Sequence, residues 1–148
     1  MSGEFDGAAV ERRVRESFAR QGLMAHLGAE MHRIGRGEVA IRLPFRPALT
    51  QQNGFFHAGG VAAVADSAGG YAGLTLFPEG EDVLTVEFKL NLLNPARGEA
   101  VEAIGRVVKA GRTLTICQLE VFAEAEGRRV QVALGQQTLI RVPPRTAG

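Results

Sequence analysis

The stretch QQNGFFHAGGVAAVADSAGGYAG, residues 51–73, runs from a polar loop into a segment that is apolar or small on every side. Asp66 is the only charged residue between His57 and Glu79. A helix that is apolar all round is buried inside a protein, and its small side chains let other elements pack closely around it. The stretch therefore predicts a buried central helix that begins near Ala58 and carries one carboxylate.

A membrane span is the alternative for residues 58–77, which number 20 and hold only Asp66 as a charge. That length is enough to cross a bilayer. The segment, however, contains five glycines and is rich in Ala rather than Leu or Ile. An ionised Asp near its middle would also be costly in lipid. We therefore expect no membrane partner.

The second half of the chain predicts the elements that surround this helix. Residues 83–93 alternate between polar and apolar types, which is typical of a half-buried strand. The apolar members, predicted to share one face, are Leu84, Val86, Phe88, Leu90 and Leu92. Further strands are predicted over residues 99–110, 113–125 and 128–142, with tight turns between them. Long strands joined by tight turns form an antiparallel meander.

The first half predicts an amphipathic helix over residues 8–22, followed by a hairpin over 29–45 and a loop over 44–57. The whole order is helix, two strands, long buried helix and four strands. This order predicts an α+β fold in which a curved antiparallel sheet wraps around one central helix. We expect a single domain over residues 1–148, with a flexible arm at 1–7 and a flexible tail at 143–148.

Composition narrows the possible partners and the location. The 148 residues carry 17 basic and 16 acidic side chains, a net charge of +1, and the basic residues are scattered. This argues against nucleic acid, which is usually bound by a basic face. The single cysteine, Cys117, cannot form an internal disulfide, and the N-terminal residues lack a signal-peptide pattern. We therefore expect a cytoplasmic protein. The sequence also contains no metal-binding motif, so no metal is expected.

Three segments in order carry a resemblance to a known family: residues 53–72, 84–98 and 109–113, that is NGFFHAGGVAAVADSAGGYA, LTVEFKLNLLNPARG and KAGRT. Over roughly residues 20–142 the chain resembles hotdog-fold acyl-CoA thioesterases of the phenylacetate-degradation (PaaI) type. The resemblance implies that Asp66 is the catalytic carboxylate, as nucleophile or general base. It also implies that the residue after His57 supplies a backbone N–H to the thioester carbonyl. That residue is Ala58 here, where the family most often has Gly, and its N–H is retained.

The resemblance implies further roles around this centre. The amides of Gln51 and Asn53 would contact the thioester, and the hydroxyl of Thr85 would hold the attacking water. Basic residues would bind the phosphates of coenzyme A: Arg97, Lys109 and Arg112. No cofactor is implied beyond the coenzyme A of the substrate. Each of these residues also has a purely structural explanation, since loop amides form turns, strands favour Thr, and surface charges are solvated.

The residues themselves support this chemistry. Hydrolysis of a thioester needs a base or nucleophile, and donors for the charge that develops on the carbonyl oxygen. The N–H groups of Ala58 and Gly59, at the start of a buried helix, suit that charge. Eight residues separate Ala58 from Asp66, which is about 12 Å along a helix. One thioester carbon cannot contact both, so we predict at least a homodimer with shared sites; the resemblance implies that a tetramer is also common.

Several alternatives compete with this hypothesis. Asp66 could be satisfied by Ser67 or the backbone, and His57 could simply cap the helix. A dehydratase of the same fold has Glu fourteen residues after the loop His, where this chain has Tyr71. A hydratase would need an acid five residues from the His, and none is present. A non-catalytic acyl-CoA binding protein would keep its function in Asp66→Ala, whereas an enzyme would lose turnover.

Overall fold

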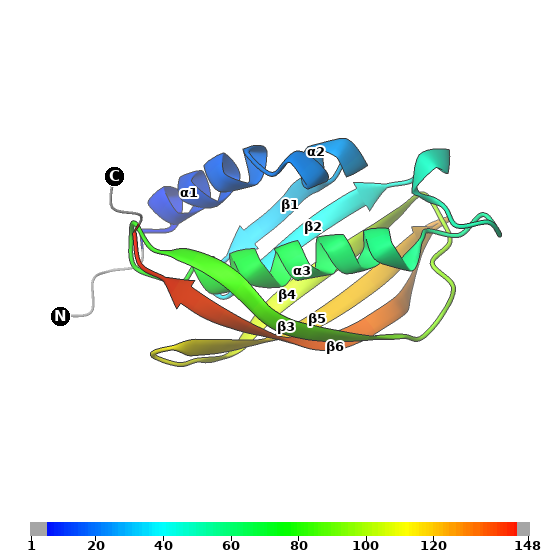
Figure 1. The fold of residues 1–148 in the computed structure, drawn as a ribbon. Coiled ribbons are helices and arrows are strands. Elements are labelled where there is room, and N and C mark those ends of the chain that lie inside the picture. The colour runs from blue at the N-terminus through cyan, green and yellow to red at the C-terminus, as the bar shows by residue number, and fades with distance from the viewer. Residues whose placement is uncertain (1–5, 145–148) are drawn as a thin grey trace.

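A six-stranded antiparallel sheet curves around one long helix in the computed structural model, which describes residues 6–144 (Figure 1). The helices are α1 (Gly7–Ala19), α2 (Gly22–Leu27) and α3 (Ala58–Leu74), with a short 3-10 turn η1 (Pro47–Leu49). The strands are β1 (Glu30–Gly35), β2 (Glu38–Pro44), β3 (Asp82–Leu92), β4 (Ala100–Ala110), β5 (Leu114–Ala125) and β6 (Arg128–Val142). The predicted α+β class is confirmed.

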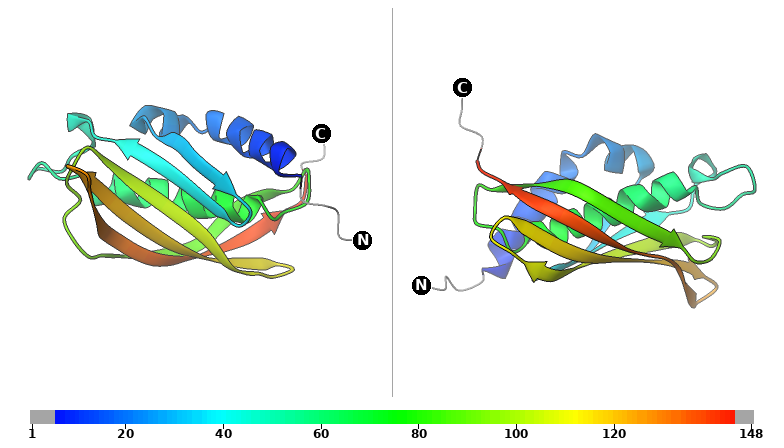
Figure 2. Two further views of the ribbon diagram at one scale, coloured as in Figure 1. Left: turned by 180° about the vertical axis from the view of Figure 1, so that it is seen from behind. Right: turned by 60° about the horizontal axis from the view of Figure 1, so that its bottom comes forward.

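The order of strands across the sheet is β1-β2-β4-β5-β6-β3, so β1 and β3 are its two edges. Figure 2 shows β1 and β2 beside the N-terminal helices, with β3 and β6 at the other side of the sheet. The predicted helices and strands all form; the strand bounds agree within one residue, and the first helix, expected over residues 8–22, ends three residues early, at Ala19. The sequence pattern missed α2 and η1, which are short elements of six and three residues.

The predicted terminal arms lie mostly beyond the part of the chain that the structure describes. Residues 1–5 and 145–148 are outside it. Asp6 caps α1 by accepting hydrogen bonds from the N–H groups of Ala8 and Ala9, so the helix begins at Gly7. Of the arm predicted over residues 1–7, Asp6 and Gly7 therefore belong to the start of α1.

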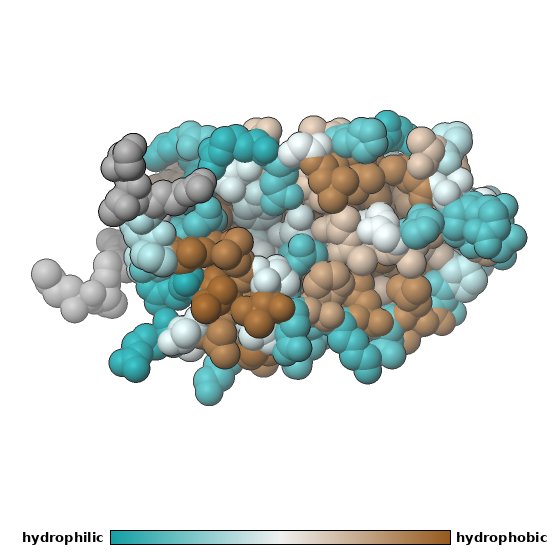
Figure 3. Space-filling model, viewed as in Figure 1, coloured by the Kyte–Doolittle hydropathy of each residue, from teal (hydrophilic) through white to brown (hydrophobic). Residues whose placement is uncertain are grey.

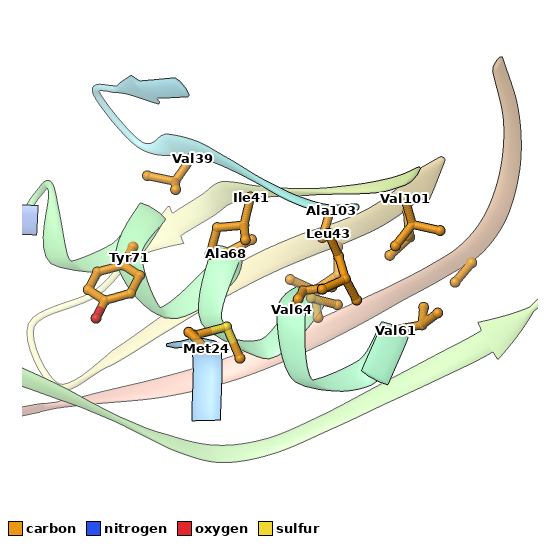
Figure 4. Packing of buried hydrophobic residues seen from close by; sticks show 14 of the residues in the cluster. Met24, Val39, Ile41, Leu43, Val61, Val64, Ala68, Tyr71, Val101 and Ala103 are labelled. Atoms are coloured by element: carbon orange, nitrogen blue, oxygen red, sulfur yellow. The ribbon is translucent and has the colours of Figure 1, made fainter. Parts of the chain in front are cut away.

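Helix α3 is the centre of the hydrophobic core, as its sequence predicts. Val64 and Ala68 of α3 are fully buried and pack against Ile41 of β2 (Figure 4). On the side that faces α1, the Tyr71 ring packs edge-on against Phe18. Among residues 6–144, no helix is both long enough and apolar enough to span a bilayer.

The contact between α3 and the sheet is closest at Gly69 and Gly105 of β4. A Cβ built on Gly105 would lie 2.5 Å from the Cα of Gly69, and one on Gly69 would overlap the side-chain oxygen of Gln137. Neither position has room for any side chain. The buried Cys117 of β5 lies beside them, its Sγ 3.6 Å from the Gly69 carbonyl oxygen, and burial raises its pKa to about 12. Cys117 is therefore an uncharged thiol at neutral pH, and it serves as a core residue.

The C-terminal end of α3 is capped by an arginine from α1. The Arg13 guanidinium donates hydrogen bonds to the carbonyl oxygens of Leu74, Phe77 and Pro78, at 2.5, 3.0 and 2.9 Å. These carbonyl groups belong to the last residue of α3 and to the turn that follows it, and a cation suits this end of the helix dipole. Arg13 thus ties α1 to the central helix.

Strand β3 departs from the predicted alternation. A bulge between Thr85 and Glu87 shifts its register against β6, so residues on the two sides of the bulge no longer share a face. The expectation of one buried apolar face was wrong: of its five members only Leu90 packs against the core, where Val83 of the same strand joins it. The exposed apolar residues of this edge strand are Leu84, Val86, Phe88 and Leu92. Figure 3 shows the resulting apolar surface where β3 crosses the front of the molecule.

Replacing Gly105 with alanine should destabilise the protein by about 1–3 kcal/mol, because the added methyl group would press on the backbone of α3. Urea unfolding followed by circular dichroism would measure this as a lower midpoint. Gly22→Ala is the matched control, since Gly22 is exposed and an added Cβ there meets no atom within 4 Å. Equal midpoints for Gly105→Ala and wild type would contradict the close packing of helix and sheet.

Candidate active site

Asp66 lies midway along α3, where the helix faces β3 and β6. The Thr85 hydroxyl donates to Asp66 Oδ1 at 2.7 Å, and Gln137 Nε2 donates to the same oxygen at 2.6 Å. Gln137 Nε2 also lies 3.1 Å from the Asp66 carbonyl oxygen and 3.1 Å from Thr85 Oγ1. Two strands therefore hold one oxygen of the carboxylate in place.

The second oxygen of this carboxylate, Oδ2, has no hydrogen-bond partner within residues 6–144, and Asp66 is only partly buried. The alternative that Ser67 satisfies Asp66 is excluded, because the Ser67 hydroxyl donates to Gln21 Oε1 at 3.2 Å instead. A carboxylate with one oxygen fixed and the other open can accept a proton from water or attack an electrophilic carbon.

The start of α3 offers one open backbone N–H as a hydrogen-bond donor. His57 is the N-cap, and its ring Nδ1 accepts from the Gly59 N–H at 2.7 Å. The N–H groups of Gly60 and Val61 bond to the His57 carbonyl oxygen. The Ala58 N–H has no partner in the described part of the chain, and it lies at the positive end of the helix dipole. Of the two predicted donors, Ala58 is open and Gly59 is occupied by the ring.

This hydrogen bond also determines which nitrogen of a neutral His57 ring carries the proton. Because Nδ1 accepts a hydrogen bond, a neutral ring carries its proton on Nε2. The residue is exposed, so Nε2 remains available as a donor beside the Ala58 N–H. The capping role considered from the sequence is thus present, and it leaves one ring nitrogen open.

Ala58 and Asp66 belong to one uninterrupted helix, which extends from Ala58 to Leu74. Their separation along its axis is therefore about 12 Å, as the sequence predicts. Two grooves on the surface of the single chain, of about 510 and 1050 Å³, are lined by other residues and include neither of these two. Within one chain, the carboxylate and the N–H donor do not converge on a common pocket.

The predicted loop amides lie just before the helix start. Gln51 Oε1 accepts from the backbone N–H groups of Asn53 and Phe55, at 2.5 and 3.4 Å. Gln51 therefore shapes the loop through its oxygen, and its Nε2 has no partner among the described residues. Asn53 is exposed at the turn, and its side chain likewise has no hydrogen bond in residues 6–144. The structure places both near the start of α3.

The predicted basic residues separate into two groups. Arg97 stacks over the Phe55 ring, 4.3 Å from its centroid, close to the loop that leads into α3. Lys109 is at the far end of β4, and Arg112 is in the turn that follows. About ten strand residues, or roughly 30 Å, separate the two groups. A single chain does not bring these three cations together.

The structure argues against the dehydratase alternative. Tyr71, which stands where that enzyme class has its Glu, is buried and directs its hydroxyl to Ser17 and Gln21 near α1. It faces away from Asp66. In the part of the chain that the structure describes, no three His, Cys, Asp or Glu side chains are grouped so that they could hold a metal ion.

The sequence analysis missed Gln137, which contacts Asp66 more extensively than any predicted residue. A signal was present in the sequence. Leu139 and Gln137 are two apart in a strand, so they share a face, and Leu139 is fully buried. A glutamine at an inward position of a strand needs a polar partner, and Asp66 is the charged residue of the helix that the sheet encloses.

Comparison with known proteins places this arrangement in a family. The model of the thioesterase superfamily matches residues 53–129. A predicted esterase of Halobacterium salinarum is 31% identical over 130 residues, which cover 81% of this chain and 85% of that protein. A thioesterase family protein of Silicibacter pomeroyi, known from its crystal structure, is 46% identical and superposes with a TM-score of 0.89 over 90% of this chain and 98% of its own.

The fold itself is shared more widely. The PaaI protein of the phenylacetic acid degradation operon of E. coli superposes with a TM-score of 0.83 at 15% identity, over 93% of this chain and 96% of that protein. At that identity the likeness concerns the fold alone. The hotdog fold expected from the sequence is thus confirmed.

Proposed function

This chain belongs to the thioesterase superfamily, and we propose that the thioester it hydrolyses is an acyl-CoA, which it converts to a free carboxylic acid and coenzyme A. The observation that carries the proposal is the hydrogen bonding of the two carboxylate oxygens of Asp66. It is a carboxylate on an otherwise apolar helix, with Oδ1 fixed by Thr85 and Gln137 and with Oδ2 open. A protein that only bound acyl-CoA would gain nothing from such a group.

The proposed reaction uses Asp66 Oδ2 at the thioester carbon. As a base, Oδ2 takes a proton from a water molecule while the water oxygen bonds to that carbon. As a nucleophile, Oδ2 bonds to the carbon itself, and water then hydrolyses the acyl anhydride. In either route the carbon–sulfur bond breaks, the acyl group leaves as the acid, and the sulfur of coenzyme A is released as the thiol.

The Ala58 N–H is proposed to stabilise the negative charge on the carbonyl oxygen. It is unpartnered and lies at the positive end of a helix dipole, which is the environment that stabilises such an anion. The open ring nitrogen of His57 and the Nε2 of Gln51 are further donors beside it. The hydroxyl proton of Thr85 goes to Asp66, so any water at Thr85 would donate to its oxygen. Gly59 contributes by fixing the His57 ring.

We further propose that each site is formed by two subunits, because Ala58 and Asp66 are about 12 Å apart on one helix. The β3 edge supports this assembly. It is 11 residues long, it pairs only with β6 among the strands of residues 6–144, and it exposes large apolar side chains. Long apolar edge strands are normally covered. A second copy that pairs β3 with β3 would cover the edge and bring two α3 helices to the same side of one continuous sheet.

A symmetric dimer of this kind contains two equivalent sites. A tetramer, formed from two such dimers, is compatible with the proposal. The dimer also provides a reason for the two groups of cations. The phosphates of a coenzyme A bound at one site would contact Arg97 of one subunit together with Lys109 and Arg112 of the second subunit. Arg97, Lys109 and Arg112 are proposed on this basis as the residues that bind coenzyme A. A cytoplasmic location and the absence of any other cofactor remain part of the proposal.

Asp66→Asn should lower kcat by about 10²–10⁴-fold, because the amide can neither accept the proton nor attack. The measurement is thiol release from a panel of aromatic and aliphatic acyl-CoA thioesters. Binding of the substrate should persist in the variant, which separates an enzyme from a binding protein. Glu79→Gln, which removes an exposed carboxylate beyond α3, is the matched control. Full activity of Asp66→Asn, or no thiol release from any thioester by wild type, would refute the proposed function.

Val86→Lys should produce a monomer in sedimentation velocity at micromolar concentration, with turnover at least about tenfold lower, because a lysine on an edge strand opposes strand pairing. Val108→Lys is its matched control, since Val108 is an equally exposed apolar residue at a bulge of β4, away from the β3 edge. A wild-type protein that sediments as an active monomer would contradict the assembly.

A further inference from the structure

Gln137 is a buried amide at the base of the site, with 1% of its surface exposed. Its Nε2 lies within hydrogen-bond distance of Asp66 Oδ1, the Asp66 carbonyl oxygen and Thr85 Oγ1. Its Oε1, in contrast, is buried without a hydrogen-bond partner. The side chain therefore directs its hydrogen bonds at Asp66, on which the proposed reaction depends, and at Thr85, which itself donates to Asp66.

The chemistry of these neighbours determines which way the amide points. Rotating it by half a turn would place Oε1 against a carboxylate oxygen and a carbonyl oxygen, which are both acceptors. With Nε2 in place, Thr85 Oγ1 accepts from Gln137 and donates its own proton to Asp66. Gln137, Thr85 and Asp66 thus form one directed chain of hydrogen bonds, in which each bond strengthens the next.

This arrangement requires two residues, Gln137 and Gly69, that each lower the stability of the fold locally. An unpartnered buried carbonyl oxygen is destabilising, and an apolar side chain of the same length would avoid it. Gly69 is unfavourable in the middle of a helix, but any side chain there would overlap Gln137 Oε1. The lack of a side chain at Gly69 is a condition for the approach of the amide to Asp66, and it also makes room for Leu119 and Gly105. Local rules are broken in this way mainly at functional sites.

We propose that Gln137 is a positioning residue of the active site. Through its own N–H and through the Thr85 hydroxyl it holds Asp66 Oδ1, and this fixes the rotation of the carboxylate so that Oδ2 is directed out of the sheet toward the bound thioester. The inference rests on the proposed function, because it assigns to Gln137 the orientation of the group that reacts. Gln137 does not itself contact the substrate.

The first variant is Gln137→Met, which keeps the length of the side chain and removes the donor. Its kcat should fall about 10–100-fold with KM changed less than about threefold, because Asp66 loses its orientation and the substrate contacts remain. Gln136→Met is the matched control: Gln136 is the exposed neighbour on the other face of β6, and its substitution should leave both constants unchanged. Rates are normalised to the folded fraction by circular dichroism.

The second variant, Gln137→Glu, tests the contact by its pH profile. It places a second carboxyl group against Asp66, and two carboxyl groups at that distance share one proton. Since Asp66 acts in its ionised form, the acid limb of the kcat profile should move to higher pH by at least about one unit. This shift tests whether the side chain at position 137 contacts Asp66, and the fall of kcat in Gln137→Met tests whether that contact positions the carboxylate.

The other titratable groups near Asp66 do not account for a shift of this acid limb. Cys117, which faces α3 from β5, has its pKa raised to about 12 by burial. Arg141, further along the helix side of β6, is paired with Glu81. Tyr71 of α3 turns to α1, and His57 lies about 13 Å away at the helix start. The charged side chains of β2 and β4 pair on the outer face of the sheet, among them Glu38, Arg42, Glu102 and Arg106.

Asp66→Asn is assayed beside these variants so that the two proposals can be distinguished. Loss of turnover in Asp66→Asn, with a wild-type kcat in folded Gln137→Met or a wild-type acid limb in Gln137→Glu, would overturn the role of Gln137 and leave the proposed function standing. Full activity in Asp66→Asn would overturn the proposed function itself. Should Gln137→Met fail to fold, Gln137→Leu, which also removes the donor, is assayed in its place.

Discussion

The contact of α3 with the sheet at Gly69 and Gly105 is the constraint on which the rest of the structure depends. Without side chains at this point, the helix backbone lies directly on β4, and residues from β6 and β3 can reach around it. The amide of Gln137 occupies the space that Gly69 leaves, and from there it meets Asp66. The arrangement of the carboxylate therefore follows from how closely the helix packs, and that follows from the small residues of the sequence.

The same helix separates two groups that the proposed reaction requires together. Its first turn offers the Ala58 N–H, and Asp66 lies about 12 Å further along. A straight helix cannot fold back on itself, so in the proposed reaction one subunit would supply only half of each site. The unpaired apolar edge of β3 provides the surface on which a second copy could complete it. Catalysis and assembly are, in this account, two consequences of one helix.

The sequence was sufficient to predict the fold, because the buried helix and the long alternating strands have strong periodic patterns. It also identified Asp66, since a single acid in an apolar helix is conspicuous. The bulge at Thr85 could not be foreseen: an inserted residue leaves the alternation of types intact while it turns half of the strand over. The bulge places Leu84 on a different face from Phe88, Leu90 and Leu92. Phe88 and Leu92 share the face of Leu90 and are exposed on a strand at the edge of the sheet. Gln137 was missed because its partner lies 71 positions away in the chain.

The central claim, that each site combines Asp66 of one subunit with the Ala58 N–H of its partner, is tested most directly by complementation. Ala58→Pro removes only the N–H, because proline is well accommodated at the first position of a helix and the extended backbone of His57 suits a following proline. Asp66→Asn and Ala58→Pro subunits, each nearly inactive alone, would be co-expressed with different affinity tags and purified through both tags. The account predicts that the mixed dimer recovers about half of the wild-type thiol release, because one of its two sites holds both intact groups. A mixed dimer as inactive as its parents would contradict it.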